Sequence, residues 1–134
     1  MTSSKIILCK ASAGSGKTFT LAKTYLQIVL NFEHEQFCNY DRILAVTFTN
    51  KATEEMKSRI LKFLTEISQI LSEEDCKKSD IAQALLSEYP HCTYQLLAWK
   101  AKIALSKILH DYSQFSIMTI DKFFNRIVKA FLFE

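Results

Sequence analysis

The stretch KIILCKASAGSGKTFTLAK at residues 5–23 decides the fold. It opens with a short apolar run, KIILC at 5–9, which is typical of a buried strand in a parallel sheet. The only two glycines of the 134-residue chain, Gly14 and Gly16, follow at once, and helix-spaced apolar residues come after them. The order of strand, glycine turn and helix predicts the first unit of an α/β fold.

The glycine turn has the spacing of a phosphate-binding loop. Residues 11–18, ASAGSGKT, fit the pattern G-x-x-x-x-G-K-[ST] except at its first position, where Ala11 stands. Such a loop turns its backbone N–H groups toward a phosphate, and the following helix adds its partial positive charge. The alternative to a phosphate-binding loop is a glycine turn in which Lys17 faces solvent and Thr18 caps the helix.

The pattern predicts an ATP site. We expect Lys17 to reach the β- and γ-phosphates and the Thr18 hydroxyl to bind Mg²⁺, which makes these two residues the catalytic candidates. The expected ATP-binding residues are Ala11, Ser12, Ala13, Gly14, Ser15, Gly16, Lys17 and Thr18.

Further strands and helices alternate along the chain. RILAVTF at 42–48 and FSIMTI at 115–120 read as two more strands, and 121–133 reads as a final helix. Apolar residues recur at helical spacing from Ala52 to Leu71, which predicts a long helix, and Glu55 and Arg59 on its other face are placed for an i,i+4 ion pair. After a polar break at 72–80, the stretches 80–88 and 93–111 also read as helices.

The helical block at about 65–111 interrupts the alternation and reads as an insertion. The sequence therefore predicts one domain over 1–134, a parallel sheet flanked by helices. Because the helical pattern at its end has no stop signal, we expect it to be a fragment.

Composition limits the function classes. The chain is 49% hydrophobic and 23% charged, as globular proteins are, and its net charge of +3 permits nucleic acid without requiring it. The four cysteines form no C-x-x-C pair, so we expect reduced thiols. No apolar run approaches the roughly 18 residues of a membrane span, and no signal peptide is recognisable. The expected location is the cytoplasm, without membrane partners.

Three motifs carry a family resemblance. Together with ASAGSGKT, the stretch ILAVTFTNKATEEMKSRI at 43–60 and TIDKFF at 119–124 resemble the N-terminal motor domain of superfamily 1 helicases of the UvrD/RecB type. The resemblance is firm over about 5–62 and 115–130 and weak across the inserted block. It implies a RecA-like P-loop NTPase fold, here partial.

The resemblance assigns the second motif to single-stranded DNA. In the family this segment contacts the strand, which implies DNA binding by Thr47, Phe48, Thr49, Asn50 and Lys51. The residue types suit that role, since an aromatic ring stacks on any base and hydroxyl or amide groups bond phosphate oxygens. On the residues alone, the alternative is equally open that Phe48 is core and Asn50 caps the next helix.

The third motif implies that Thr119 and Asp121 also face DNA. Asp121 stands where UvrD-like members often have histidine, and this form is similar to the RecB/AddA side of the family. The alternative is that Thr119 or Asp121 caps a helix, and we expect Phe123 and Phe124 to lie in the core.

The chain departs from the family pattern in two respects. No glutamine precedes the loop to read adenine, and no Asp-Glu pair follows an apolar strand beyond the third motif. We therefore expect the chain to bind ATP with Mg²⁺ but not to hydrolyse it well by itself.

The resemblance implies an ATP-dependent DNA helicase or helicase–nuclease of DNA repair. Its expected partners are single-stranded DNA and a partner subunit of the helicase–nuclease. The runner-up is a stand-alone, nucleotide-dependent module that binds single-stranded DNA without catalysis. A nucleotide kinase is a weaker alternative, because its lid needs arginines and only Arg42, Arg59 and Arg126 exist.

Overall fold

The structure is a computed structural model that describes residues 16–33 and 40–132. Its helices are α1 (Gly16–Leu30), α2 (Asn50–Ser68), α3 (Glu73–Lys78), α4 (Asp80–Glu88), α5 (Tyr94–His110) and α6 (Ile120–Leu132). Its strands are β1 (Ala45–Thr47) and β2 (Ile117–Thr119), and short 3₁₀ turns, η1 (Tyr40–Arg42) and η2 (Tyr112–Gln114), precede them.

The two described strands form a parallel pair, as the sequence predicts. Ala45 lies opposite Ile117 and Thr47 lies opposite Thr119. Both strands are shorter than expected: α6 begins directly after β2, and α2 begins at Asn50, three residues after the end of β1. The described fold is therefore dominated by helices with a small parallel sheet. The strand predicted at 5–9 lies outside the described residues.

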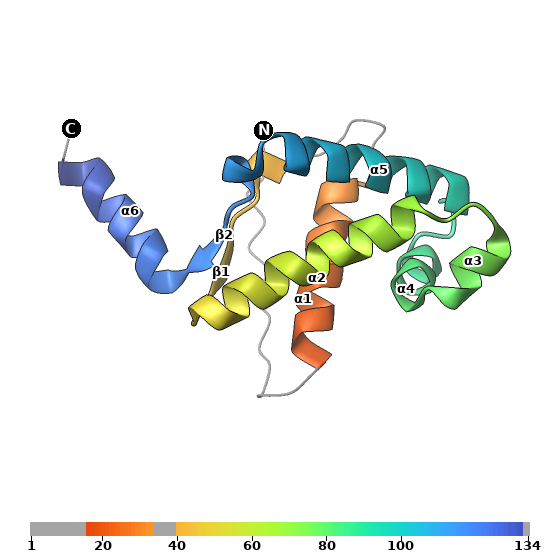
Figure 1. Ribbon diagram of the computed structural model, residues 1–134, viewed down its shortest axis with the longest axis horizontal. Coiled ribbons are helices and arrows are strands. Elements are labelled where there is room, and N and C mark those ends of the chain that lie inside the picture. Colours follow the sequence, from red (N-terminus) through yellow and green to blue (C-terminus); the bar gives the residue numbers. More distant parts are fainter. Residues whose placement is uncertain (1–15, 34–39, 133–134) are drawn as a thin grey trace.

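The core lies between α1, α2, α4 and α5. α5 runs along α2, and α1 crosses behind α2 (Figure 1). The helical stripe predicted for α2 is confirmed, since Ile60, Leu64 and Ile67 are fully buried. Leu71 was expected to extend this stripe but is exposed, because α2 ends at Ser68.

Four consecutive helices begin at a hydroxyl side chain. The hydroxyl oxygens of Thr49, Ser72, Ser79 and Thr93 each accept a hydrogen bond from the backbone N–H three residues further on. Such caps satisfy backbone groups that a helix start leaves unpaired. The helices expected at 80–88 and 93–111 are confirmed as α4 and α5. Their status as an insertion stays a prediction.

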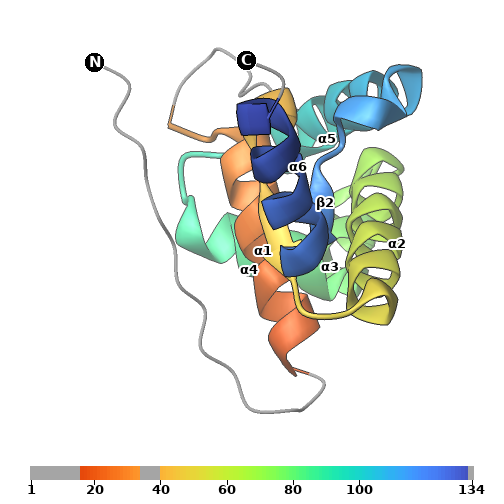
Figure 2. The same cartoon turned by 90° about the vertical axis from the view of Figure 1, so that its left-hand side faces the viewer.

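Helix α6 projects away from the other helices, at the end of the molecule opposite α3 and α4 (Figures 1 and 2). None of its residues is buried, and Phe124 is 58% exposed. The prediction that Phe123 and Phe124 lie in the core is therefore wrong. The physical reason is that α6 contacts mainly two strands of three residues each, which are too short to cover an apolar helix face. Among the described helices, none is both long and apolar enough to cross a membrane.

Candidate nucleotide and nucleic-acid site

The carboxyl ends of β1 and β2 lie side by side, because Thr47 pairs with Thr119. α2 and α6 begin within three residues of these strand ends. Two helix N-termini, each with a partial positive charge, therefore lie at one edge of the sheet. We call residues 47–51 and 119–122 the strand edge. In open α/β folds, ligands bind outside this edge.

Phe48 is the most exposed large apolar side chain of the described residues, at 87%. The alternative that it belongs to the core is wrong. The Thr47 hydroxyl contacts Thr53 of α2, so the next side chain along the chain points away from that helix. No described element covers it there. An exposed phenyl ring can stack on a planar group of a bound molecule.

The start of α2 is capped by Thr49. Its backbone is extended, with φ −130° and ψ 155°, and its hydroxyl oxygen accepts from the Ala52 N–H at 3.0 Å. The alternative that Asn50 caps this helix is therefore wrong, because Asn50 is already its first residue. The Thr49 hydroxyl hydrogen is not used by this bond, and the Asn50 and Lys51 side chains are exposed.

Thr119 has the same position at the start of α6. Its hydroxyl oxygen accepts from the Lys122 N–H at 3.2 Å, which confirms helix capping by Thr119. Asp121 is exposed in the first turn, where the helix dipole favours an acidic side chain. Capping leaves the Thr119 hydroxyl hydrogen available for an acceptor. A DNA contact by Thr119 or Asp121 stays a prediction.

The phosphate-loop residues are only partly described. Gly16 is the first residue of α1, so Lys17 and Thr18 lie in its first turn, and both are half-buried. The Thr20 hydroxyl donates to the Gly16 carbonyl at 2.9 Å within the same turn. The described part of the chain is therefore helical at Lys17 and Thr18, as the motif predicts. Ala11, Ser12, Ala13, Gly14 and Ser15 lie outside the described residues.

Helix α1 is fixed at its far end by a buried lysine. The Lys100 amine of α5 donates to the carbonyls of Leu30 and Asn31, each at 3.0 Å. Asn31 has a positive φ of 45°, which ends the helix there. Burial lowers the pKa of Lys100. A cation at the C-terminal end of a helix also matches the helix dipole.

A second tie joins the middle of α1 to α4. Glu88 accepts hydrogen bonds from Lys23 and Gln27 of α1. The bond from Lys23 is the main reason that the pKa of Glu88 is lowered. Helix α1, which carries Lys17 and Thr18, is thus held by α4 at its middle and by α5 at its far end.

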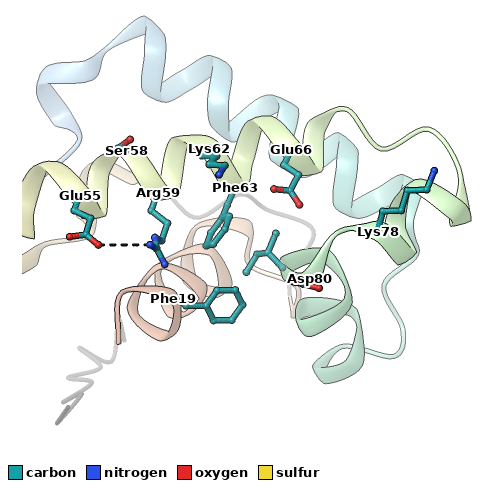
Figure 3. Close-up of a pocket in the computed structure, with 10 residues that line it drawn as sticks. Phe19, Glu55, Ser58, Arg59, Lys62, Phe63, Glu66, Lys78 and Asp80 are labelled. Carbon is teal, nitrogen blue, oxygen red and sulfur yellow. Dashed lines mark ion pairs between the residues drawn. The ribbon is translucent and has the colours of Figure 1, made fainter. Parts of the chain in front are cut away.

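A groove of about 490 Å³ lies beside the start of α1 (Figure 3). Its floor contains Phe19 of α1 and Phe63 of α2, whose rings meet edge-to-face with centroids 5.6 Å apart. Charges of both signs surround it, including the expected ion pair of Arg59 and Glu55 at 3.8 Å. Sequence reasoning missed the groove, because its lining comes from helices that are distant in the chain.

Comparison with known proteins identifies the family of this chain. Residues 1–134, the whole chain, match the UvrD/REP helicase N-terminal domain. The chain is similar to RecBCD enzyme subunit RecB of Haemophilus influenzae, with 43% identity over 65 residues, 46% of this chain and 5% of that protein. It is similar to an ATP-dependent helicase/nuclease subunit of Pediococcus pentosaceus, with 46% identity over 68 residues, 48% of this chain and 5% of that protein.

The corresponding helicase/nuclease subunit of Bacillus cereus is 44% identical over 61 residues, again 46% of this chain and 5% of the relative. The chain thus matches only about 5% of the length of these relatives. No solved structure matches it. The resemblance to the RecB/AddA side is confirmed, and this chain belongs to the UvrD/REP helicase N-terminal domain family.

Proposed function

We propose that this chain is the ATP-binding N-terminal part of an ATP-dependent superfamily 1 DNA helicase or helicase–nuclease that moves along single-stranded DNA in DNA repair. The observation that carries the proposal is Phe48, 87% exposed at the carboxyl end of β1 and beside the start of α2. The names of the relatives, which are helicase/nuclease subunits, support the same class. The proposed location is the cytoplasm.

On the DNA side, Phe48 would stack on a base. Stacking of this kind contributes about 1–3 kcal/mol per base and does not depend on the base sequence. The Thr49 and Thr119 hydroxyls have a hydrogen left to donate to phosphate oxygens, and Lys51 adds a positive charge. These groups would position the strand without reading it.

Two further residues complete the proposed DNA surface. The exposed Asn50 amide lies beside the Thr49 cap and would also bond the sugar–phosphate backbone. Asp121 carries a negative charge, so it would face the N–H groups of a base rather than a phosphate.

On the nucleotide side, the start of α1 fits a triphosphate. The first turn of a helix offers unpaired N–H groups, and Lys17 and Thr18 lie in that turn. Lys17 would hold the β- and γ-phosphates and Thr18 would hold Mg²⁺, which neutralises charge on the phosphates. In the complete protein, ATP binding would close a cleft between two motor domains, so that Phe48 releases and regrips the strand.

The experiment compares Phe48→Ala with Lys17→Ala in fluorescence anisotropy titrations with oligo-dT and with a fluorescent Mg²⁺–ATP analogue. We expect Phe48→Ala to weaken oligo-dT binding by roughly tenfold, the lower half of the stacking range, and to leave nucleotide binding unchanged. Lys17→Ala should do the reverse. The proposal fails if Phe48→Ala binds oligo-dT as tightly as the unchanged chain does.

A further inference from the structure

Thr53 is a buried polar residue behind the exposed Phe48. It lies one turn into α2 and is only 6% exposed. Its hydroxyl oxygen is 2.5 Å from the Thr47 hydroxyl oxygen and 3.2 Å from the Thr49 carbonyl. The Thr47 hydroxyl is also 3.2 Å from the same carbonyl. The three threonines thus form a closed set of contacts.

Counting hydrogens shows how this set is satisfied. Each hydroxyl has one hydrogen to donate. Two hydroxyl oxygens 2.5 Å apart need a hydrogen between them, so either Thr47 donates to Thr53 or Thr53 donates to Thr47. The hydroxyl that accepts this bond keeps its own hydrogen for the Thr49 carbonyl. Both hydrogens are used in either arrangement.

It follows that Thr47 has no hydrogen to offer a DNA phosphate while the set is intact. A phosphate oxygen only accepts hydrogen bonds, so the Thr47 side chain acts within the protein instead. By contrast, the Thr49 hydroxyl uses only its oxygen, for the Ala52 N–H, and keeps its hydrogen. The neighbouring threonines therefore have different roles.

Phe48 lies between the two residues that the set joins. The Thr47 side chain and the Thr49 carbonyl are on either side of it, and both are bound to Thr53. The backbone of Phe48 is thereby held although its ring touches no core element. Fixing a contact residue before binding reduces the conformational entropy that binding must remove.

We propose that Thr53 is a positioning residue that fixes the Thr47–Asn50 turn, so that Phe48 is presented in its DNA-stacking position. This inference rests on the proposed binding of single-stranded DNA by Phe48. Thr53 itself touches no DNA, because its side chain is buried.

The test compares a substitution that removes the hydroxyl of Thr53 with one that keeps it. Thr53→Val removes the hydroxyl and keeps the shape, whereas Thr53→Ser keeps the hydroxyl. Thr65→Val is the matched control, because Thr65 is an exposed threonine of the same helix whose hydroxyl donates to the Leu61 carbonyl. We expect Thr53→Val to weaken oligo-dT binding by roughly 3- to 10-fold, the cost of ordering about one side chain. Thr53→Ser and Thr65→Val should bind as the unchanged chain does.

A double-mutant cycle separates positioning from a general structural role. If Thr53 acts through Phe48, adding Thr53→Val to Phe48→Ala causes no further loss of oligo-dT affinity. The loss of stability caused by Thr53→Val, measured by urea unfolding, should be the same with and without Phe48→Ala. Additive losses of DNA affinity would overturn the inference, and so would full affinity in Thr53→Val.

A measurement without DNA keeps the inference independent of the proposed function. The backbone order parameter of the Phe48 amide, from ¹⁵N relaxation, should fall in Thr53→Val and stay unchanged in Thr53→Ser. An unchanged order parameter in Thr53→Val overturns the positioning role. If Phe48→Ala leaves oligo-dT binding intact, the proposed DNA contact fails, while the order parameter still decides whether Thr53 holds the turn.

Discussion

The helices around the core and the strand edge with α6 use similar side chains in opposite ways. In the core, Leu26, Leu64 and Leu97 are completely buried between α1, α2 and α5. In α6, no residue is buried, and Phe131 remains 75% exposed. Large apolar side chains thus stabilise the core, whereas in α6 no other described element covers them.

Polar groups show the same contrast. The core region buries the Lys100 amine and gives it two carbonyl acceptors. The strand edge keeps Thr49 and Thr119 at the surface, where each hydroxyl accepts one backbone N–H and keeps a hydrogen to donate. The core region satisfies its lysine internally, whereas at the strand edge Thr49 and Thr119 each keep a hydroxyl hydrogen for a partner outside the protein, and only Thr47 is satisfied internally. The difference indicates which part of the chain stabilises the fold, and it supports the proposal that the strand edge binds other molecules.

The largest expected effect comes from truncating the core. Leu64→Ala should lower the free energy of unfolding by about 2–5 kcal/mol, because it removes buried methyl groups and leaves a cavity. Phe131→Ala in α6 is the comparison variant and should change it by less than about 0.5 kcal/mol. Urea unfolding followed by circular dichroism measures both. Equal losses in the two variants would show that α6 is packed after all, and the contrast between the regions would be lost.

The next effect concerns the buried tie at the end of α1. Lys100→Met should lower the free energy of unfolding by about 1–3 kcal/mol, because the carbonyls of Leu30 and Asn31 lose their buried donor. Lys102→Met, at an exposed position of the same helix, is the control and should be nearly neutral. A neutral Lys100→Met would mean that the amine does not hold α1.

The burial of Lys100 can also be tested by the pH dependence of the free energy of unfolding. Burial lowers its pKa in the folded chain, so the unfolded chain binds the proton more tightly. The penalty for burying the charge is fully present below the folded pKa and is relieved as the pH rises toward the ordinary lysine value of about 10.4. Stability should therefore gain a rising component in that range, and Lys100→Met should remove it. The same slope in both proteins would contradict the burial of a charged amine.

The sequence predicted the order of the described helices and strands except α3, because each of the others has a strong local signal, whereas α3 (Glu73–Lys78) lies in a stretch expected to be a polar break. Met56, Ile60 and Leu64 recur at helical spacing, and they are buried on one face of α2. The position of α6 could not be predicted in this way. Its amphipathic pattern is as clear as that of α2, but only the neighbouring elements decide whether such a face is covered.

At the candidate site, the sequence motifs predicted the strand edge but not the hydrogen bonds among its threonines. The sequence does not decide the exposure of Phe48, because an aromatic residue at a strand end fits a core and a stacking site equally well. The role of Thr53 was missed. The available signal was a threonine three residues before Met56, on the face of α2 where the stripe is otherwise apolar. Its partner Thr47 is six residues away, so only the fold reveals the pair.

The smallest expected effect concerns the exposed interaction of Glu88 with α1, which is compared with the buried hydrogen bonds of Lys100. In Glu88→Gln, the free energy of unfolding at neutral pH should fall by about 0.5 kcal/mol, because exposed ion pairs are strongly screened. Lys23 and Gln27 lower the pKa of Glu88, so its contribution is present above the unfolded value of 4.5 and is lost as the pH falls through the folded value. The difference in the free energy of unfolding between Glu88→Gln and the unchanged chain should therefore shrink on acidification, and also at high salt.

Glu74→Gln, at an exposed position of α3, is the control and should show neither trend. A loss as large as that of Lys100→Met would mean that α1 is held as firmly at its surface as at its buried end.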